Sequence, residues 1–463
     1  MIFILLQIAF VIILSLAYLN RHYRVHLHII TGFVAKAMCS GVFIAGRNEG
    51  LKEKDDLPSD LMKYATVTID HKDLSASSSF FGLAHSKAIY RPGLGATLIH
   101  ELTEKEIRAQ KFNLTSPPDV NQDDIPWPMG DKTDHYSIPS NINRTLLQDA
   151  ISSLFIEKDR KKLINTRAVV VVYDGKLIAE QYARSWPRTS KHLGWSMTKS
   201  IISALFGIVA QEKNLDINGP APVSEWNESD DPRHSITIKD LLQQTSGLNF
   251  VEDYTSSSDA LKMLYLTSNM AKNAASHALG DKPGTQFSYS SGNTNILSRI
   301  IRDIVGENEY HSFPYRKLFY KLGMNSFIME VDASGTFVGS SYSYGTARDW
   351  ARFGLLYLSN GLYNNEQILS KDWIEQTIKS SGANRGYRYG FQFWLNNPVS
   401  DDSSERRFPN APTDMYYASG NLGQNVFIIP SKKLAIVRLG ATKTPGSDYG
   451  ADDFLKTVIA SIE

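Results

Sequence analysis

The segment that decides how this chain folds is His192-Leu-Gly-Trp-Ser196-Met-Thr-Lys199-Ser200, which continues directly into an apolar run over residues 201–210. Ser196 and Lys199 form the only Ser-x-x-Lys pattern among the 463 residues. Residues three apart on a helix are separated by about one turn, so both side chains project from the same face. Because residues 201–210 contain no charged side chain, we expect this helix to be buried, with Lys199 in its first turn.

The pairing of Ser196 with Lys199 suits nucleophilic catalysis. A serine hydroxyl is a weak nucleophile unless a neighbour accepts its proton, and a lysine in a dry pocket can do so because burial lowers its pKa. The free N–H groups of a first helical turn also suit a developing oxyanion. An isolated Ser-x-x-Lys is more often a capping serine beside a solvated lysine. The uncharged helix that follows favours the catalytic interpretation.

The composition is that of a globular protein with ample apolar core, since 42% of residues are hydrophobic and 21% are charged. A formal net charge of +1 gives no electrostatic footprint for nucleic acid. The single cysteine, Cys39, excludes an intrachain disulfide and a metal site built from cysteines. The eleven histidines include no His-Glu-x-x-His pattern, so a zinc hydrolase has no support in the sequence.

Residues 2–19 form an uncharged run of 18 residues, near the lower limit for crossing a bilayer. Small residues at 15–17 suit cleavage by a signal peptidase, but no Lys or Arg precedes the run. Arg21 and Arg24 follow it, which favours a cytosolic C-terminal side, although long domains often cross regardless of this bias. We interpret residues 1–19 as an uncleaved membrane anchor, with the catalytic part outside the cytoplasm in the cell envelope. A secreted or periplasmic protein after signal cleavage is the alternative.

The remaining chain divides into an N-terminal extension and linker over residues 20–142 and a regular domain over residues 143–463. In the regular domain, strand patterns occur at both ends and helical patterns lie between them. Strands are expected at 168–173, 176–182, 390–394, 425–430 and 434–440. Helices are expected at 146–161, after Ser196, and at 237–244, 259–269, 293–306 and 452–462. This order predicts an α+β fold with one antiparallel sheet, flanking helices and an inserted helical subdomain.

Four further segments accompany the Ser196 motif in a fixed order. They are Ile236-Thr-Ile-Lys-Asp-Leu-Leu-Gln-Gln-Thr-Ser-Gly247-Leu248, Pro283-Gly284-Thr-Gln-Phe-Ser-Tyr289-Ser-Ser291, Tyr344-Gly-Thr-Ala-Arg-Asp349-Trp-Ala-Arg-Phe-Gly354 and Tyr417-Ala418-Ser419-Gly420-Asn421-Leu-Gly423-Gln424. Together the five segments resemble the serine β-lactamase and penicillin-binding-protein superfamily. The likeness covers residues 145–463 and is greatest to the class C-like branch, which includes esterases, D-amino-acid peptidases and 6-aminohexanoate-dimer hydrolases. It implies a β-lactamase/transpeptidase-like fold.

The resemblance also implies a role for individual residues. Ser196 would be the nucleophile, while Lys199 and Tyr289 would move protons, because a phenol beside an ammonium is driven toward phenolate. The backbone N–H groups of Ser196 and Asn421 would hold the oxyanion. Substrate-binding positions are expected at Ser291, Ser419, Gly420 and Tyr254.

A second tyrosine, Tyr363, competes with Tyr289 for the catalytic role. The segment Tyr363-Asn364-Asn365 fits the family's Tyr-x-Asn motif better than Tyr289-Ser290-Ser291 does. It lies in a turn-rich stretch between helical patterns, so we interpret it as a surface loop. If Tyr289 is the catalytic tyrosine, Ser291 replaces the family asparagine with a shorter side chain that cannot donate twice.

The sequence departs further from the family at Ala418. Penicillin-recognising members carry Lys or His there, and that cation helps to bind a substrate carboxylate. We therefore expect an acyl-transfer serine hydrolase that acts on a small ester or amide, with no metal or organic cofactor implied. A D,D-peptidase or β-lactamase is the alternative within this fold, and an arginine such as Arg385 or Arg388 could restore the missing charge. A catalytically silent envelope binding protein is the third possibility.

Overall fold

The computed structural model describes residues 24–47, 57, 60–133, 138–159, 162–383, 389–398 and 405–462. The expected anchor 1–19 and the arginines at 385 and 388 lie outside these residues. The chain forms two compact units. The first consists of Met1–Gln110, Phe250–Met270 and Val331–Gly335, and the second of Lys111–Asn249, Ala271–Glu330 and Thr336–Glu463.

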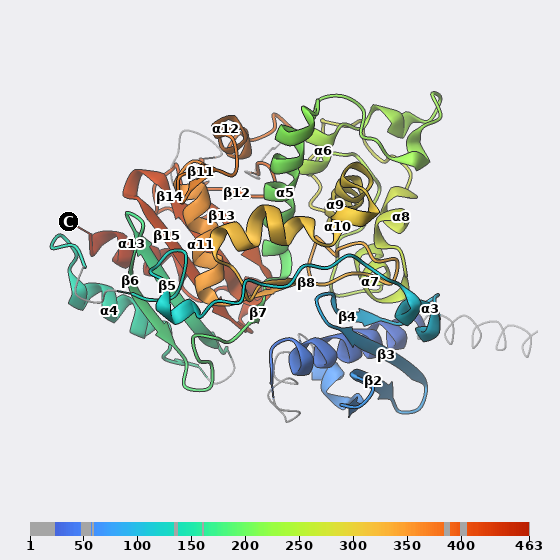
Figure 1. Ribbon diagram of the computed structural model, residues 1–463, viewed down its shortest axis with the longest axis horizontal. Coiled ribbons are helices and arrows are strands. Elements are labelled where there is room, and N and C mark those ends of the chain that lie inside the picture. Colours follow the sequence, from blue (N-terminus) through green and yellow to red (C-terminus); the bar gives the residue numbers. More distant parts are fainter. Residues whose placement is uncertain are drawn as a thin grey trace, which may run out of the picture. The chain divides into compact units, whose positions relative to one another are not determined.

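A six-stranded antiparallel sheet forms the centre of the second unit (Figure 1). Its strand order is β12-β13-β14-β15-β5-β6. The strands are β5 (Thr166–Tyr173), β6 (Lys176–Tyr182), β12 (Trp394–Leu395), β13 (Tyr416–Gly420), β14 (Gln424–Ile429) and β15 (Leu434–Gly440). The register pairs Ile436 of β15 with Val171 of β5, so the first and the last strand of this sheet in chain order lie side by side within it. This confirms the predicted antiparallel sheet. Asp174 and Gly175, which join β5 to β6, both have positive φ, as a two-residue hairpin turn requires.

Helices cover both faces of this sheet. One face packs against α4 (Arg144–Ser153) and α13 (Ala451–Ala460), where Val169, Val171 and Phe454 share one apolar core. The other face packs against α11 (Ala347–Leu358). Because the sheet is covered on both sides, β5 reads as an unbroken valine run rather than an alternating pattern.

Between β6 and β12 the second unit is mainly helical. Its elements there are β7 (His192–Leu193), α5 (Thr198–Lys213), α6 (Ile238–Leu242), α9 (Ser291–Val305), α10 (Glu307–Tyr310), β8 (Ile328–Met329), β9 (Ser343–Gly345), α11, β10 (Leu362–Tyr363), β11 (Glu366–Gln367) and α12 (Lys371–Thr377). Short helix α8 (Met270–Ala275) begins at the boundary between the units. As predicted, the helix after Ser196 is buried, because every residue from Thr198 to Val209 is inaccessible to solvent or nearly so.

Several expected elements are shorter in the structure, and the helices expected at 237–244 and 259–269 span only Ile238–Leu242 and Asp259–Leu266. The helix expected at 146–161 ends at Ser153, and the Glu157 carboxylate instead accepts hydrogen bonds from the N–H groups of Ile164 and Asn165. Of the strand expected at 390–394, only Trp394 is extended. Gln392 has a positive φ of 59° and turns its side chain inward, which breaks the strand.

The first unit contains a four-stranded antiparallel sheet and a long helix. The strands are β1 (Thr66–Asp70), β2 (Ser75–Phe80), β3 (Ala84–Arg91) and β4 (Gly95–Leu98), paired in chain order. The helices are Arg24–Phe43, α3 (Glu104–Ala109) and α7 (Asp259–Leu266). Helix Arg24–Phe43 is long and apolar enough to cross a membrane, but two thirds of its apolar window is buried within the protein.

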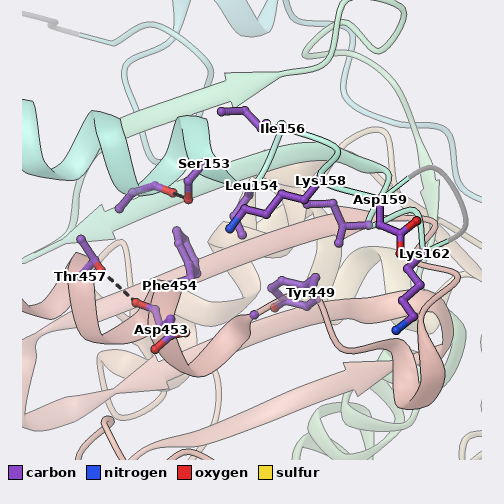
Figure 2. Close-up of a pocket in the computed structure, with 13 residues that line it drawn as sticks. Ser153, Leu154, Ile156, Lys158, Asp159, Lys162, Tyr449, Asp453, Phe454 and Thr457 are labelled. Atoms are coloured by element: carbon purple, nitrogen blue, oxygen red, sulfur yellow. Dashed lines mark hydrogen bonds between the residues drawn. The ribbon is translucent and has the colours of Figure 1, made fainter.

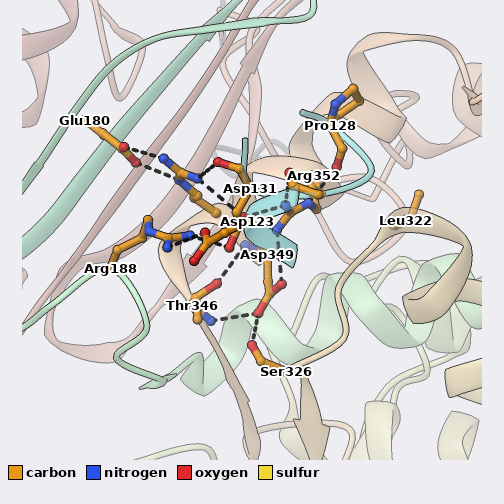
Figure 3. A network of polar contacts seen from close by, with 12 residues as sticks. Asp123, Pro128, Asp131, Glu180, Arg188, Leu322, Ser326, Thr346, Asp349 and Arg352 are labelled. Carbon is orange, nitrogen blue, oxygen red and sulfur yellow. Dashed lines mark hydrogen bonds and ion pairs between the residues drawn. The ribbon is translucent and has the colours of Figure 1, made fainter. Parts of the chain in front are cut away.

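A network of buried charges ties residues 121–132 to the rest of the second unit (Figure 3). The Asp131 carboxylate accepts hydrogen bonds from Arg188 at 2.5 Å and Arg352 at 2.7 Å, and Arg348 lies 3.5 Å away. Arg348 also forms a two-point ion pair with Glu180 of β6. Since the side chains of Arg348 and Arg352 are 4% and 2% exposed, these contacts compensate for charges removed from water.

We predict that Asp131→Asn lowers the free energy of unfolding by about 3 kcal/mol, because it leaves buried arginines without their shared carboxylate. The matched variant Asp123→Asn removes a carboxylate that is 62% exposed and that pairs, among the described residues, with Arg188 alone, and its cost is expected to stay below about 1 kcal/mol. Urea unfolding measures both values. Equal losses for the two variants would contradict this account of the network.

The contribution of Asp131 also depends on pH. Burial acts to raise the pKa of Asp131, but Arg352, Arg348 and Arg188 outweigh it and hold the pKa below the ordinary value of 3.8. The stabilisation is therefore complete above pH 3.8 and is lost as the pH falls through the lower pKa of the folded state.

Candidate active site

The turn that carries Ser196 is fixed by close packing. Ser196 lies in a single 3-10 turn, Trp195–Met197, directly before α5. Gly194 donates its N–H to the Ser343 carbonyl at 2.8 Å, and the Thr198 and Ser343 hydroxyls are 2.7 Å apart. A Cβ atom at Gly194 would lie 2.5 Å from the Trp350 ring, so only glycine fits there. Trp195 has a positive φ of 49°, which is a strained backbone conformation for a bulky residue.

The Lys199 side chain is buried beside Ser196. The residue is 1% exposed, and its Nζ atom donates to Ser196 Oγ at 3.2 Å, Ser291 Oγ at 3.1 Å and the Ser340 carbonyl at 2.9 Å. These three acceptors are neutral oxygens from three separate segments. The Ser340 segment is itself held by the side chain of Asn295 in α9, which accepts the Ser340 N–H at 3.1 Å. The amine therefore has a fixed position within hydrogen-bonding reach of the serine hydroxyl.

The Tyr289 ring also lies near the Lys199 amine. The Lys199 Nζ atom is 4.9 Å from the centroid of the Tyr289 ring. That ring stacks on Trp394 of β12 at 5.5 Å and meets Tyr389 edge-on at 6.0 Å. The structure thus brings together Ser196, Lys199 and Tyr289, with aromatic side chains forming one wall beside them.

A buried network of amide side chains holds the Tyr289–Ser291 loop. The Gln244 side-chain oxygen accepts hydrogen bonds from the Ser290 N–H at 3.1 Å and from the Asn293 amide at 2.9 Å. Its Nε2 atom donates to Gln392 Oε1 at 3.3 Å, and Gln392 Nε2 donates to two carbonyls of α6. Gln244 and Gln392 both have positive φ, which the surrounding packing imposes.

Strand β13 ends beside the turn that carries Ser196. A Cβ atom on Gly420 would lie 2.3 Å from the Gly194 carbonyl and 3.2 Å from Trp195 Cβ, so this approach requires glycine. Asn421 follows at the start of a 3-10 turn, Asn421–Gly423. Ser419 accepts a hydrogen bond from the Asn425 amide at 3.2 Å. The end of β13, with Ser419, Gly420 and Asn421, is therefore adjacent to Ser196 in space.

Arg438 holds the Asn421–Gly423 turn through hydrogen bonds to its backbone. It is fully buried in β15, and its guanidinium donates to the carbonyls of Leu422 at 3.3 Å and Gly423 at 2.9 Å. It also lies 4.2 Å from the centroid of the Tyr449 ring. Burial lowers the pKa of Arg438 to about 10, so the group remains charged at neutral pH.

The side chains and backbone groups that support the site were not identifiable from the sequence. Gln244 lies within the quoted segment 236–248, but nothing in that segment shows which side chain faces the tyrosine loop. Gln392, the Ser340 carbonyl and Arg438 carry no local signal, because their partners lie far away in the sequence.

Three residues considered in the sequence have other surroundings. The hydroxyl of Tyr363 donates to the carbonyls of Pro128 and Leu322, and residues 364–365 form the turn of the short hairpin β10–β11. Ala418 is 1% exposed in β13, and its methyl side chain supplies no charge to a substrate. Tyr254 belongs to the first unit, where its hydroxyl donates to Glu252, and its substrate-binding role stays a prediction.

A separate cavity of about 330 Å³ lies between α4 and α13 (Figure 2). Leu154, Tyr449 and Phe454 line it, with Lys158 and Lys162 at its edge. None of its lining residues belongs to the Ser196, Tyr289 or Asn421 segments.

Comparison with known proteins agrees with this geometry. The family model described as Beta-lactamase matches residues 151–460. This chain belongs to the β-lactamase family. A 6-aminohexanoate-dimer hydrolase of Paenarthrobacter ureafaciens is 23% identical over 317 residues, which cover 61% of this chain and 74% of that protein.

Two solved structures share the fold of this chain. A penicillin-binding-protein homologue from Caulobacter crescentus matches with a TM-score of 0.56 at 15% identity, over 70% of this chain and 98% of that chain. A family VIII carboxylesterase matches with a TM-score of 0.53 at 14% identity, over 70% of this chain and 97% of that chain. The predicted β-lactamase/transpeptidase-like fold is therefore confirmed.

We predict that Gln244→Met slows labelling of Ser196 by a fluorophosphonate about tenfold or more, because the Tyr289–Ser291 loop loses its acceptor. Gln243→Met is the matched control, since Gln243 is also buried, at 5% exposure, and within the described part of the chain its amide donates to the Lys379 carbonyl rather than to the tyrosine loop. Labelling rates followed by mass spectrometry measure the effect. A larger loss in the Gln243 variant would refute the assigned role of Gln244.

Proposed function

We propose that this member of the β-lactamase family is a serine hydrolase that cleaves a small ester or amide through an acyl-enzyme. The observation that carries the proposal is the buried Lys199 amine, 3.2 Å from the Ser196 hydroxyl. A buried lysine next to a serine suits proton transfer, since it exchanges a proton over a short and fixed distance. The similarity to a 6-aminohexanoate-dimer hydrolase and to a carboxylesterase supports the same reaction class.

In the proposed reaction, Ser196 Oγ attacks the substrate carbonyl and forms a bond to its carbon. Its proton passes to uncharged Lys199, which relays it through the Tyr289 hydroxyl to the leaving alcohol or amine as the bond between that group and the acyl carbon breaks. The N–H groups of Ser196 and Asn421 stabilise the negative oxygen of the tetrahedral intermediate. A water molecule then attacks the acyl-enzyme, and the acid product leaves with Ser196 regenerated.

The proposed substrate class follows from the lack of a cationic side chain at Ala418, near the end of β13. A carboxylate that enters a partly dry site loses hydration and needs a cation or several donors in exchange. Ala418 offers neither, and Ser291 is shorter than an asparagine in that place. Ser419 and Gly420 beside the nucleophile remain available to orient a neutral acyl group. We therefore favour uncharged esters and amides over penicillins and peptides that end in a carboxylate.

For the cellular location, we propose that residues 2–19 hold the enzyme in the membrane, with the catalytic unit outside the cytoplasm. Eighteen uncharged residues favour insertion into a bilayer over exposure to water. A protein with residue 18 at its N-terminus would instead show that the segment is a cleaved signal peptide.

We predict that Ser196→Ala abolishes hydrolysis of p-nitrophenyl esters and leaves the melting temperature nearly unchanged, because one small residue replaces another. Removing one member of a catalytic set costs orders of magnitude in rate. Ester hydrolysis above a trace in this variant would exclude Ser196 as the nucleophile. Wild-type protein that reacts with neither a fluorophosphonate nor a penicillin would favour a silent binding protein instead.

We predict that Tyr289→Phe lowers the acylation rate by about a hundredfold or more at an unchanged melting temperature, because only the proton-carrying hydroxyl is lost. Tyr363→Phe is the matched control, since its hydroxyl donates to two backbone carbonyls. Stopped-flow release of p-nitrophenol measures acylation. A greater defect in Tyr363→Phe would show that Tyr363 is the catalytic tyrosine.

We predict a higher kcat/KM for p-nitrophenyl butyrate than for nitrocefin. The loss of one charge-assisted hydrogen bond typically costs about 1.5–3 kcal/mol, which corresponds to roughly a tenfold to hundredfold loss in binding. Steady-state kinetics with both substrates measure the ratio. Equal or greater efficiency with nitrocefin would identify the enzyme as a β-lactamase, and preference for D-alanyl-D-alanine peptides would identify a D,D-peptidase.

A further inference from the structure

The end of the first unit's sheet at the β2–β3 turn is unusually apolar. Phe81 and Leu83, in the turn between β2 and β3, are 72% and 66% exposed. Tyr64, which is 67% exposed, lies two residues before the start of β1. The register pairs Thr66 with Ser79, which places Tyr64 at the same end of the sheet as the turn. We call Tyr64, Phe81 and Leu83 the sheet tip.

The exposure of these apolar side chains to water is energetically unfavourable, and so is the backbone conformation of Phe81. Phe81 has a positive φ of 48° and is followed by Gly82 at 72°. Turns of this type ordinarily carry Asn, Asp or Gly, because a bulky side chain is strained in the left-handed region. A phenylalanine there is costly both as an exposed ring and as a strained residue. Such a tip is typical of a surface that contacts an apolar partner.

The direction of helix Arg24–Phe43 shows where the N-terminal segment enters this unit. Near its middle, the Thr31 hydroxyl is 2.8 Å from the Ser86 hydroxyl on β3. At its end, Phe43 stacks on Tyr90, four residues farther along β3 from the tip, and its ring also contacts His71. The helix therefore runs away from the tip as the chain proceeds. Its first residue, seven before Thr31, lies about 10 Å from Thr31 toward the tip.

The apolar run 2–19 is connected to that same end. Four residues, 20–23, separate the run from helix Arg24–Phe43, and four extended residues span at most about 14 Å. If the run enters a bilayer, the start of the helix is held near the lipid surface, on the side of the sheet to which the tip belongs. Cationic Arg24 at the helix start and Lys63 beside Tyr64 suit anionic headgroups.

We propose that the sheet tip inserts into the interfacial region of the membrane that receives residues 2–19. Tyrosine favours the boundary between headgroups and acyl chains, where its ring leaves water and its hydroxyl stays hydrated, and phenylalanine and leucine bury apolar surface just below the headgroups. The tip and the anchor together give two contacts with the bilayer, which fix the orientation of the first unit on its surface. This proposal rests on the proposed membrane attachment, and its test separates the two.

The test uses the full-length chain in vesicles of phosphatidylcholine and phosphatidylglycerol. A Phe81→Cys variant carries an environment-sensitive nitrobenzoxadiazole label at the tip. Lys72→Cys is the matched control, because residue 72 is exposed in the β1–β2 turn at the opposite end of the sheet. Native Cys39 is buried and is thereby shielded from the reagent. Lipids brominated in their acyl chains quench a label that reaches the interface.

We expect the label at residue 81 to shift its emission to the blue and to lose roughly half of its intensity or more to brominated lipids, while the label at residue 72 changes little. An alkaline carbonate wash measures the anchor independently. Retention of the protein with an unquenched label at residue 81 would overturn the tip proposal and leave the anchor standing. Release of the protein with no quenching would overturn both. A blue shift without lipid quenching would identify a second copy of the chain as the partner and overturn the lipid assignment.

Discussion

The burial of the Lys199 amine is the constraint on which the structure around Ser196 depends. A polar group removed from water is costly unless hydrogen bonds compensate for the lost solvation. Here three oxygen acceptors do so, from the Ser196 turn, the start of α9 and the Ser340 segment. Each of these segments must therefore stay in place for the lysine to remain buried. The same three contacts that stabilise Lys199 also aim its amine at Ser196.

Several backbone conformations in the segments around Ser196 are energetically unfavourable. Trp195, Gln244 and Gln392 have positive φ, and glycines at 194 and 420 allow contacts that any side chain would prevent. Strain of this kind persists only when neighbouring packing determines it, and it is concentrated at functional sites. The buried amide network and Arg438 provide that packing, because they fix backbone groups on either side of the serine. Buried hydrogen bonds therefore hold the strained backbone positions around Ser196 in place.

Much of the second unit was predictable because its signals are local. The valine run of β5, the Asp174-Gly175 turn and the uncharged helix after Ser196 each follow from a few adjacent residues. Contacts such as Gln392 with Gln244 were not predictable, because they join residues that are distant in sequence. The first unit was missed for another reason. The serine-rich segment 75–80 resembles a linker, yet its buried serines are small enough to lie within a packed sheet as β2.

The most direct test of the account is whether Lys199 makes Ser196 reactive. Intact-protein mass spectrometry after brief exposure to p-nitrophenyl butyrate detects a butyryl group on the enzyme, and peptide mapping locates it. We expect an adduct on Ser196 in the wild-type protein and none in Lys199→Met. The variant is expected to keep or raise its melting temperature, because methionine fills the site without a buried amine that needs hydrogen-bond partners. An equal adduct on Ser196 in a folded Lys199→Met variant, or an adduct on another residue, would contradict it.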